Sequence, residues 1–286
     1  ISGIVRPKVS RNQQQQEVEI ELEKYQIINE TKLLPFEIKD EININEDTRF
    51  RYRYLDLRRN ISKKPLIPKI PLRVLIASWS PAALGKQRYY TLPQSPQMFK
   101  QLLMMSGFDK HYQIDKSFRN EDARSNRQIE FSQLDLEMSF TSTKKIMKLT
   151  EKFLKNVLKK SFNCQLKTPF TILTYQQAIE KYGTDKPDLL CNGEEVLSGG
   201  LRIYQRELQA KVFTILGYSP QKQEKYFGYF LQALEFAAPP HGGFGLGIDR
   251  LLAIILNLKS LKEVIAFPKN IDGSCSLTGT PNYFEK

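Results

Sequence analysis

A cluster of charged residues and a strand-like pattern follow each other in FRNEDARSNRQIEFSQLDLEMSF, from Phe118 to Phe140. The first half carries charges at Arg119, Glu121, Asp122, Arg124 and Arg127. The second half alternates, which predicts a strand with a buried apolar face (Leu134, Leu136, Met138, Phe140) and a polar face (Gln133, Asp135, Glu137). Such a polar face usually meets water. Two carboxylates and an amide beside arginines indicate instead the floor of a site for cationic and anionic groups together, such as an amino acid with a nucleotide triphosphate.

Three glycines alternate in HGGFGLGIDR, at Gly243, Gly245 and Gly247, ahead of a predicted helix that contains Arg250. Alternate glycines clear one face of a strand so that a flat group can lie on it. The pattern alone also fits a bulge or tight packing. No Gly-Lys-Ser/Thr follows, which argues against a Walker phosphate loop, and the glycines do not open a βαβ unit, which disfavours a dinucleotide fold.

A predicted helix N-terminus lies just before Lys100. Ser95 is the expected N-cap, Pro96 the first helical residue, and Gly107 the stop signal. A helix N-terminus with a nearby lysine suits a carboxylate ligand. The alternative is an exposed helix lysine, which is what most lysines are.

The composition is that of a globular protein with a polyanionic partner. The chain has 286 residues, 41% of them hydrophobic, and a formal net charge of +12, which favours RNA over a merely soluble basic surface. Three cysteines without a close pair argue against disulfides and zinc and fit a reducing compartment. Two histidines make a histidine-based metal site improbable. No apolar run is long enough to span a membrane, and the N-terminus is no signal peptide.

Periodicity and capping signals predict the elements that must position these groups. Two strands around a polar loop tip are expected before residue 30, with Val18, Ile20 and Leu22 alternating with glutamates. Further strands are expected at 112–119 and 194–204, and helices at 143–162, 175–182, 206–216 and 219–236. The stretch RFRYRYLDLRRN reads as a basic helix start or strand, or as a surface that faces RNA or a dimer partner.

The segments FRNEDAR and RQIEFSQLDLEMSF resemble motif 2 of class II aminoacyl-tRNA synthetases, the bacterial and organellar aspartyl-tRNA synthetases in particular. The segments TLPQSPQMFKQLLM, KYGTDKPDL and GIDR extend the resemblance, the last as motif 3. It implies an α+β fold, a mostly antiparallel sheet flanked by helices, with a partial N-terminal OB-type β-barrel. The implied domains are the tail of an anticodon-binding barrel (1–30), a linker (31–50) and a catalytic domain (51–286), with motif 2 at about 112–140 and motif 3 at about 241–256.

The resemblance also implies an activity and a set of site residues. The implied enzyme is an aspartate–tRNA ligase that uses ATP and Mg²⁺ to make aspartyl-adenylate and transfers aspartate to tRNA(Asp), and to tRNA(Asn) as well in some relatives. The implied catalytic residues are Arg119, Glu121 and Arg250. ATP is expected to contact Arg119, Glu121, Gln128, Glu195, Gly247, Ile248, Asp249 and Arg250, with Glu195 holding Mg²⁺. Aspartate is expected to contact Ser95, Gln97, Lys100, Arg119, Asp135 and Arg202, with Arg202 setting specificity.

This sequence departs from the family at four places. The dimer-interface strand (motif 1) and mobile loop are not recognisable in 61–83, and the inserted domain expected near 189–191 is not seen. The histidine expected after that insertion is not found, and Leu197-Ser198-Gly199 stands where the family usually has three glycines.

Two alternatives to the aspartate enzyme stay open. One is the same fold charging asparagine or lysine, against which Arg202 and Lys100 argue. The other is a non-catalytic RNA-binding or regulatory paralogue, which the basic charge fits equally well. A homodimer is expected by resemblance, in the cytoplasm of a bacterium or in the matrix of a mitochondrion or plastid.

Overall fold

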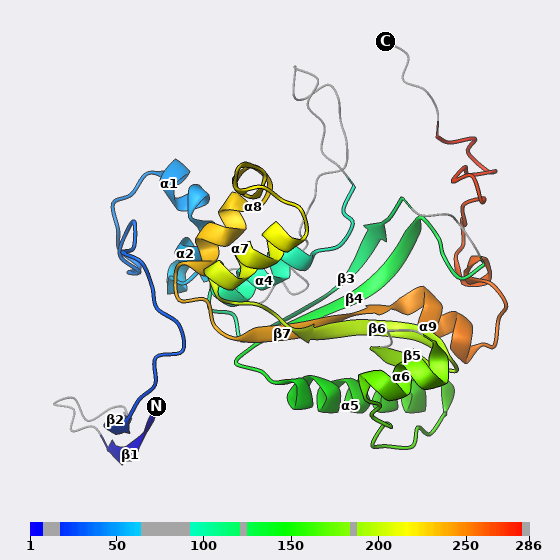
Figure 1. Cartoon of the computed structure of the whole chain (residues 1–286), viewed down its shortest axis with the longest axis horizontal. Helices are drawn as coiled ribbons and strands as arrows, with labels where there is room; N and C mark the ends of the chain where they lie inside the picture. The colour runs from blue at the N-terminus through cyan, green and yellow to red at the C-terminus, as the bar shows by residue number, and fades with distance from the viewer. Residues whose placement is uncertain (8–17, 64–91, 121–124, 184–187, 282–286) are drawn as a thin grey trace, which may run out of the picture.

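The computed structural model describes residues 1–7, 18–63, 92–120, 125–183 and 188–281, and its centre is a five-stranded antiparallel sheet in the order β3-β4-β7-β6-β5 (Figure 1). Its strands are β3 (Lys110–Phe118), β4 (Glu130–Ser139), β5 (Leu189–Cys191), β6 (Glu194–Leu201) and β7 (His241–Gly247). The two signature stretches thus become neighbours, because β4 carries the charged alternation and β7 the alternate glycines. The register places Asp135 opposite Gly245 and Glu137 opposite Gly243. The predicted antiparallel α+β fold is confirmed.

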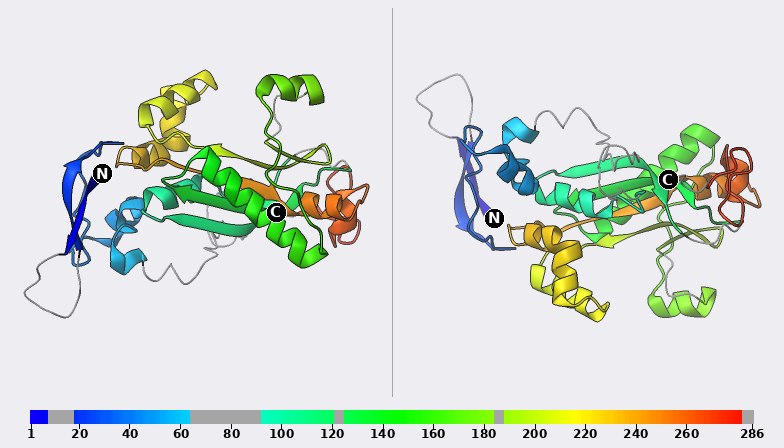
Figure 2. Two further views of the ribbon diagram at one scale, coloured as in Figure 1. Left: turned by 90° about the horizontal axis from the view of Figure 1, so that it is seen from below. Right: turned by 90° about the horizontal axis from the view of Figure 1, so that it is seen from above.

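The two faces of the sheet differ in kind. The apolar face packs on α5 (Thr143–Phe162) and α9 (Ile248–Ile255), in a core that includes Met138, Phe244 and Leu246 (Figure 2). The opposite, polar face carries α4 (Gln97–Met105) across β3 and β4. Phe140 is a correction to the predicted apolar face. It lies past the end of β4 in a left-handed conformation and is 62% exposed.

A second core lies at the end of the sheet near α4. It joins α2 (Arg53–Asp56), α4 and α8 (Pro220–Leu234) through buried residues such as Leu55, Met105 and Phe230. The remaining helical segments are α1 (Glu46–Arg51), α3 (Asn60–Lys63), α6 (Tyr175–Tyr182), α7 (Arg206–Ile215) and the 3₁₀ turn η3 (Leu261–Val264). None of the helices in the described ranges is long and apolar enough to cross a membrane.

The chain begins with a separate hairpin, β1 (Ser2–Pro7) and β2 (Val18–Lys24) (Figure 1). The two predicted strands are therefore confirmed. Val18, Ile20 and Leu22 are all more than half exposed. Their membership of a β-barrel stays a prediction.

Local signals located most helices to within a residue or two. The predicted ranges of α5 and α6 match, and Ser219 caps α8 with Pro220 as its first residue. At α4 the helix begins one residue later than predicted, with Pro96 at the cap position, while Ser95 accepts a bond from the Gln97 amide at 3.4 Å. The strand predicted at 194–204 ends at Leu201, and the short β5 before it was not predicted.

Candidate active site

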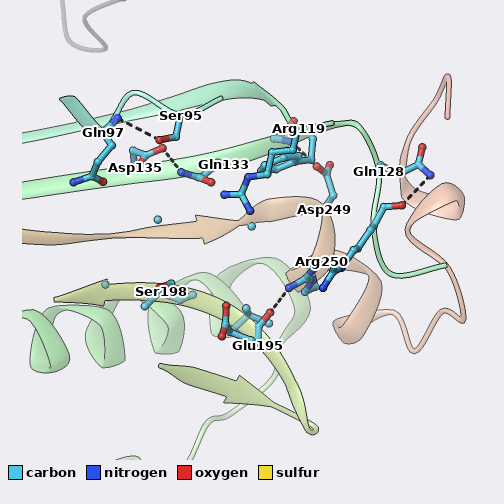
Figure 3. A pocket seen from close by; sticks show the side chains of 18 of the residues that line it. Ser95, Gln97, Arg119, Gln128, Gln133, Asp135, Glu195, Ser198, Asp249 and Arg250 are labelled. Atoms are coloured by element: carbon cyan, nitrogen blue, oxygen red, sulfur yellow. Dashed lines mark hydrogen bonds between the residues drawn. The ribbon is translucent and has the colours of Figure 1, made fainter. Parts of the chain in front are cut away.

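A cavity of about 420 Å³ opens on the polar face of the sheet (Figure 3). The predicted residues that line it are Ser95, Gln97, Lys100, Arg119, Gln128, Asp135, Glu195, Arg202, Gly247, Asp249 and Arg250. Ile248 packs in the core under the sheet instead, because it points away from the cavity with the apolar face of α9. Glu121 lies outside the described residues. The structure therefore gathers most of the predicted set, and the role of each toward a ligand stays a prediction.

Lys100 and Asp135 form a buried ion pair on the floor of this cavity. The Lys100 ammonium lies 2.7 Å from Asp135 Oδ1, and both side chains are 1% exposed. The ammonium also donates to the Phe244 carbonyl at 3.3 Å, and Gln133 donates to Asp135 Oδ2 at 2.6 Å. The alternative of an exposed helix lysine is therefore wrong. The floor of the cavity therefore presents a fixed cation, Lys100, and a fixed anion, Asp135. A carboxylate and an ammonium group of a ligand are expected to bind there.

Arg202 and Glu137 form a second pair beside the first. Arg202 Nε and Nη2 donate to the two carboxylate oxygens of Glu137 at 3.0 and 3.2 Å. Glu137 is fully buried, its Oε2 lies 3.6 Å from the Lys100 ammonium, and Arg202 is 20% exposed toward the cavity. The sequence predicted Glu137 as part of the site floor but not as the partner of Arg202, which is 65 residues away.

Arg119 and Arg250 lie at the other end of the cavity, whose lining also includes Arg127. The Arg119 guanidinium carbon lies 5.0 Å from the centre of the Phe131 ring, and both residues line the cavity. Arg250 donates to the carbonyls of Glu195 at 2.8 Å and Asn126 at 3.1 Å. An aromatic face and backbone oxygens thus position these two positive charges at this end of the cavity, which suits a phosphate ligand.

Two of the predicted ATP contacts also hold the cavity wall together. Gln128 Oε1 accepts a bond from the Lys269 amide at 2.8 Å, so its side chain ties the end of the motif 2 loop to the C-terminal segment. Asp249 accepts a bond from the Ser132 amide at 2.5 Å, which joins the start of α9 to β4.

The alternate glycines of β7 serve two different needs. A Cβ on Gly243 would lie 1.9 Å from the Leu136 carbonyl oxygen and 2.6 Å from Glu137 Oε2, so this glycine is required by packing. A Cβ on Gly245 would lie 2.8 Å from Gln133 Nε2, among the polar groups of the floor. A Cβ on Gly247 would meet nothing closer than 3.7 Å, so there the absent side chain leaves open room in the cavity.

The residues present fit Mg²⁺ only as a shared site. Glu195 lines the cavity near Arg250. Within the described ranges no group of three or more histidine, cysteine, aspartate or glutamate side chains could hold a metal ion. Mg²⁺ commonly takes one or two carboxylates and fills its shell with phosphate oxygens and water. The Glu195 carboxylate, beside an arginine whose setting suits phosphate, is consistent with that arrangement.

Neither histidine lines the cavity. His111 and His241 are 2% and 1% exposed, on β3 and at the start of β7. Burial lowers the pKa of both imidazoles, so both are neutral at pH 7. On the same face of β3, burial and the neighbouring charge of Asp135 raise the pKa of Asp115. The histidine that the resemblance predicts near aspartate therefore has no counterpart among the residues around the cavity.

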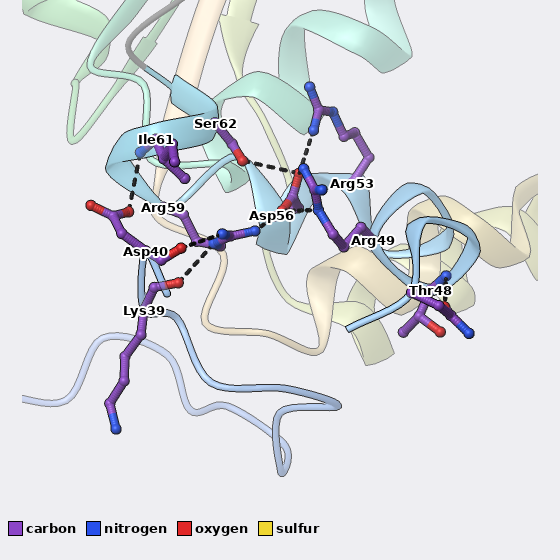
Figure 4. Close-up of polar contacts among 10 residues, drawn as sticks. Lys39, Asp40, Thr48, Arg49, Arg53, Asp56, Arg59, Ile61 and Ser62 are labelled. Atoms are coloured by element: carbon purple, nitrogen blue, oxygen red, sulfur yellow. Dashed lines mark hydrogen bonds and ion pairs between the residues drawn. The ribbon is translucent and has the colours of Figure 1, made fainter. Parts of the chain in front are cut away.

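Three arginines of RFRYRYLDLRRN gather around Asp56: Arg49 of α1, Arg53 of α2 and Arg59, which follows α2 (Figure 4). Asp56 is fully buried and pairs with Arg49 at 3.1 Å, with Arg59 at 2.7 Å and with Arg53. Burial acts to raise the pKa of Asp56, but the hydrogen bonds from Arg49 and Arg59 outweigh it and lower the pKa. Arg59 also donates to the carbonyls of residues 39 and 40, so the cluster fastens the linker to the helices. An RNA-facing role is not needed to explain these arginines.

One face of the sheet pairs a buried lysine and a partly exposed arginine with two buried carboxylates, beside Arg119 and Arg250, and these charges suit an amino acid and a nucleotide. The family described as tRNA synthetases class II (D, K and N) matches residues 79–189 and 186–271. The chain therefore belongs to the class II tRNA synthetases, a family of ligases that use ATP.

Several bacterial relatives are similar over most of this chain. An aspartate–tRNA(Asp/Asn) ligase from Dictyoglomus turgidum is 28% identical over 490 aligned positions, covering 98% of this chain and 82% of that protein. Because this chain has 286 residues, that alignment includes long stretches that the relative has and this chain lacks. An aspartate–tRNA ligase from Mycoplasma capricolum is 41% identical over 217 positions, covering 66% of this chain and only 38% of that protein.

Solved structures share the fold at lower identity. An aspartyl-tRNA synthetase from Entamoeba histolytica superposes with a TM-score of 0.52 at 21% identity and covers 92% of this chain and 75% of the other. An asparaginyl-tRNA synthetase from Pyrococcus horikoshii, complexed with asparaginyl-adenylate, gives 0.56 at 20% identity, covering 93% and 81%. These similarities establish the fold.

Proposed function

We propose that this protein is an aspartate–tRNA ligase, which activates L-aspartate with ATP and transfers it to the 3′ end of tRNA(Asp). The observation that carries the proposal is the buried set Lys100, Asp135, Glu137 and Arg202. The names of the relatives support the same activity, and those named for both Asp and Asn tRNAs extend the proposal to tRNA(Asn).

The charges of this set favour an acidic amino acid. The two cations and two carboxylates balance as long as the cavity holds no ligand. An amino acid brings an ammonium group to Asp135, and its α-carboxylate goes to Arg119. The set then has one excess positive charge shared by Lys100 and Arg202, which an aspartate side chain neutralises and an asparagine side chain does not. Uncompensated buried charge is costly, so the site disfavours neutral side chains.

The first step forms an acyl phosphate bond. A carboxylate oxygen of aspartate attacks the α-phosphorus of ATP, a new P–O bond forms, and the bond to the β-phosphate breaks to release pyrophosphate. Arg119 holds the carboxylate and the α-phosphate together, and Arg250 binds the γ-phosphate. The contribution of these residues is orientation and stabilisation of phosphate charge, and no side-chain nucleophile is required.

ATP is expected to lie along the arginine end of the cavity, with its base near the Phe131 ring and its phosphates toward Glu195 and Arg250. Gly247 leaves room there, while Gln128 and Asp249 hold the surrounding wall. Bound Mg²⁺, held by Glu195, would neutralise part of the triphosphate charge.

The second step transfers the aspartyl group to a hydroxyl of the terminal ribose of tRNA and releases AMP. The net charge of +12 supports an RNA partner. We further propose the domain division given by the resemblance, with residues 1–30 as part of an anticodon-binding barrel and 51–286 as the catalytic domain. A homodimer in a bacterial cytoplasm or an organellar matrix completes this proposal.

Pyrophosphate exchange into ATP tests the first step without RNA. The protein is incubated with Mg²⁺, ATP, labelled pyrophosphate and one of aspartate, asparagine, glutamate or lysine. Exchange with aspartate alone supports the proposal. Exchange with asparagine or lysine instead would reassign the substrate.

Absence of exchange with every amino acid would favour the non-catalytic RNA-binding reading. Thermal unfolding with ATP and Mg²⁺ then separates two cases, because a ligand that binds only the folded state raises the melting temperature. Stabilisation would mean a nucleotide-binding protein that does not activate these amino acids, and its absence would remove the nucleotide site as well.

A further inference from the structure

Helix α5 carries a row of lysines that the proposed catalytic function does not use. Seven of its twenty residues are lysines, and all seven are exposed. At about 100° per residue, five of them lie within about 80° of the helix circumference and span roughly 22 Å along its axis. We call this set the lysine stripe: Lys144, Lys148, Lys152, Lys155 and Lys159.

Packing of α5 fixes the direction of the stripe. The other side of the helix buries Ile146, Leu154 and Leu158, two of them in the core beneath β6 and β7. A Cβ on Gly242 would lie only 3.0 Å from Ile146 Cδ1, so the helix rests directly on the sheet. The stripe therefore faces away from the protein, on the sheet face opposite the cavity, where Figure 2 shows α5 lying across the sheet.

Within the described part of the chain, the stripe has no acidic partner. None of the ion pairs between described residues includes a lysine of the stripe. Glu151 is the one acidic residue of α5, and its Oε1 accepts a bond from the Phe170 amide at 2.7 Å.

Helix stability does not explain the stripe either. Like charges one turn apart repel each other. Lys144 lies in the first turn, where the helix macrodipole disfavours a cation, and that turn has no acidic residue. Only Lys159, in the last turn, is favoured by the dipole. The stripe therefore destabilises the helix on its own. We take this as an indication that an anion outside the protein binds the stripe.

We propose that the lysine stripe binds the sugar–phosphate backbone of RNA. Regularly spaced cations over roughly 22 Å match a polymer with regularly spaced phosphates. An anionic membrane fits less well, because helices that lie on membranes insert an apolar face, and the apolar face of α5 is buried under the sheet. The stripe and the cavity lie on opposite sheet faces, so RNA on the stripe is held separately from any RNA end in the cavity. The inference does not depend on the proposed catalytic activity.

Two variants with the same loss of charge test the proposal. The stripe variant is K148Q/K152Q/K155Q/K159Q, and the control variant is K181Q/K211Q/K222Q/K225Q, which removes exposed lysines of α6, α7 and α8. Glutamine keeps a helix propensity close to that of lysine. Circular dichroism and thermal unfolding confirm that both variants fold, and K152Q/K155Q serves as a milder version if the stripe variant does not.

The measurement is fluorescence anisotropy with a labelled 20-base-pair RNA hairpin of unrelated sequence, between 50 and 250 mM NaCl. If each of the four mutated lysines contacts one phosphate, the slope of log K against log salt should become shallower by about 3–4 in the stripe variant. Affinity at 100 mM salt should fall at least tenfold. The control variant should keep the wild-type slope to within about 1.

Three outcomes would overturn the proposal: a stripe variant that binds like the wild type, a control variant that loses as much, or loss of binding to phosphatidylglycerol vesicles with RNA binding intact. The last result would assign the stripe to a membrane. Pyrophosphate exchange is measured on the same variants and should be unchanged in both. Absence of exchange in the wild type would refute the proposed catalytic function and leave the RNA measurement valid.

Discussion

Replacement of Glu137 by glutamine should destabilise the protein and disturb its specificity together. Glu137 is fully buried, accepts two bonds from Arg202 and lies 3.6 Å from the Lys100 ammonium. Glutamine has nearly the same size but no charge, and its amide group turns a donor toward two donors. Lys100 then keeps Asp135 as its counter-ion, and Arg202 loses the carboxylate that it pairs with.

The expected loss follows from the burial of the pair. Removing one partner of a buried ion pair costs about 3–5 kcal/mol, and we take about 3 kcal/mol because Arg202 is partly exposed and can be rehydrated. For a chain of this size that corresponds to a fall of roughly 5–10 °C in melting temperature. The KM for aspartate in pyrophosphate exchange should rise at least tenfold, since Arg202 loses the contact that orients it.

A double-mutant cycle separates the pair from other effects of each change. The unfolding free energies of E137Q, R202Q and E137Q/R202Q should show a coupling of about 2 kcal/mol, because residues in direct contact are not additive. Additive losses, or an E137Q protein that melts and binds aspartate like the wild type, would refute the role given to Glu137.

Four further results are expected. Arg119→Ala should lower the rate of pyrophosphate exchange roughly 10³-fold, through lost stabilisation of phosphate charge. Gly247→Ala should melt like the wild type, because its Cβ meets nothing closer than 3.7 Å, yet raise the KM for ATP several-fold. Asp56→Asn should lower the free energy of unfolding by about 3 kcal/mol, since it removes the buried carboxylate that pairs with the buried Arg59. Lowering the pH from 7.5 to 5.5 should reduce the free energy of unfolding, because burial lowers the folded pKa of His111 and His241.

The sign of the pH effect follows from proton counts. An unfolded histidine has a pKa of about 6.5. Burial lowers the folded pKa of both histidines, so the unfolded state binds more protons below that pH and stability is lost as the pH falls. In H111Q/H241Q the decline between pH 7.5 and 5.5 should be smaller, as denaturant titrations at both pH values would measure. If the free energy of unfolding of H111Q/H241Q falls as much as that of the wild type, groups other than the two histidines cause the pH dependence.

Normal exchange in Arg119→Ala would contradict the proposed placement of the α-phosphate. A Gly247→Ala protein that binds ATP like the wild type would mean that the cavity does not hold the nucleotide. If Asp56→Asn costs less than about 1 kcal/mol, the arginine cluster is a surface pairing of the weak kind.

Signals within a few residues predicted much of the fold. The amphipathic period fixed both ends of α5, and Ser219 with Pro220 fixed the start of α8. The alternation of β4 separated its core face from its polar face. Phe140 continues the apolar alternation in the sequence but does not lie on the buried face. The strand ends at Ser139, and Phe140 adopts a left-handed backbone conformation.

Local sequence signals could not predict which residues far apart in the chain contact each other. The motifs predicted that Lys100, Asp135 and Arg202 belong to one site, but not which carboxylate each cation meets. That depends on the register between β4 and its neighbours and on the position of α4, which no local pattern encodes. At Asp56 the contacts are local, because Arg49, Arg53 and Arg59 lie within seven residues of it, but the sequence pattern did not show that these arginines pair with a buried carboxylate.

The position of β5 at the edge of the sheet has a consequence for how such proteins change length over evolution. The strand that follows α6 in the sequence, β5, lies at this edge, and β3 forms the opposite edge. The match to the family is divided where 79–189 meets 186–271, just before this strand. Closing a longer loop costs only about 0.6 kcal/mol for each doubling of its length. An entire folded module could therefore be gained or lost at this junction while β4, β6 and β7 keep their register and the catalytic geometry is inherited unchanged.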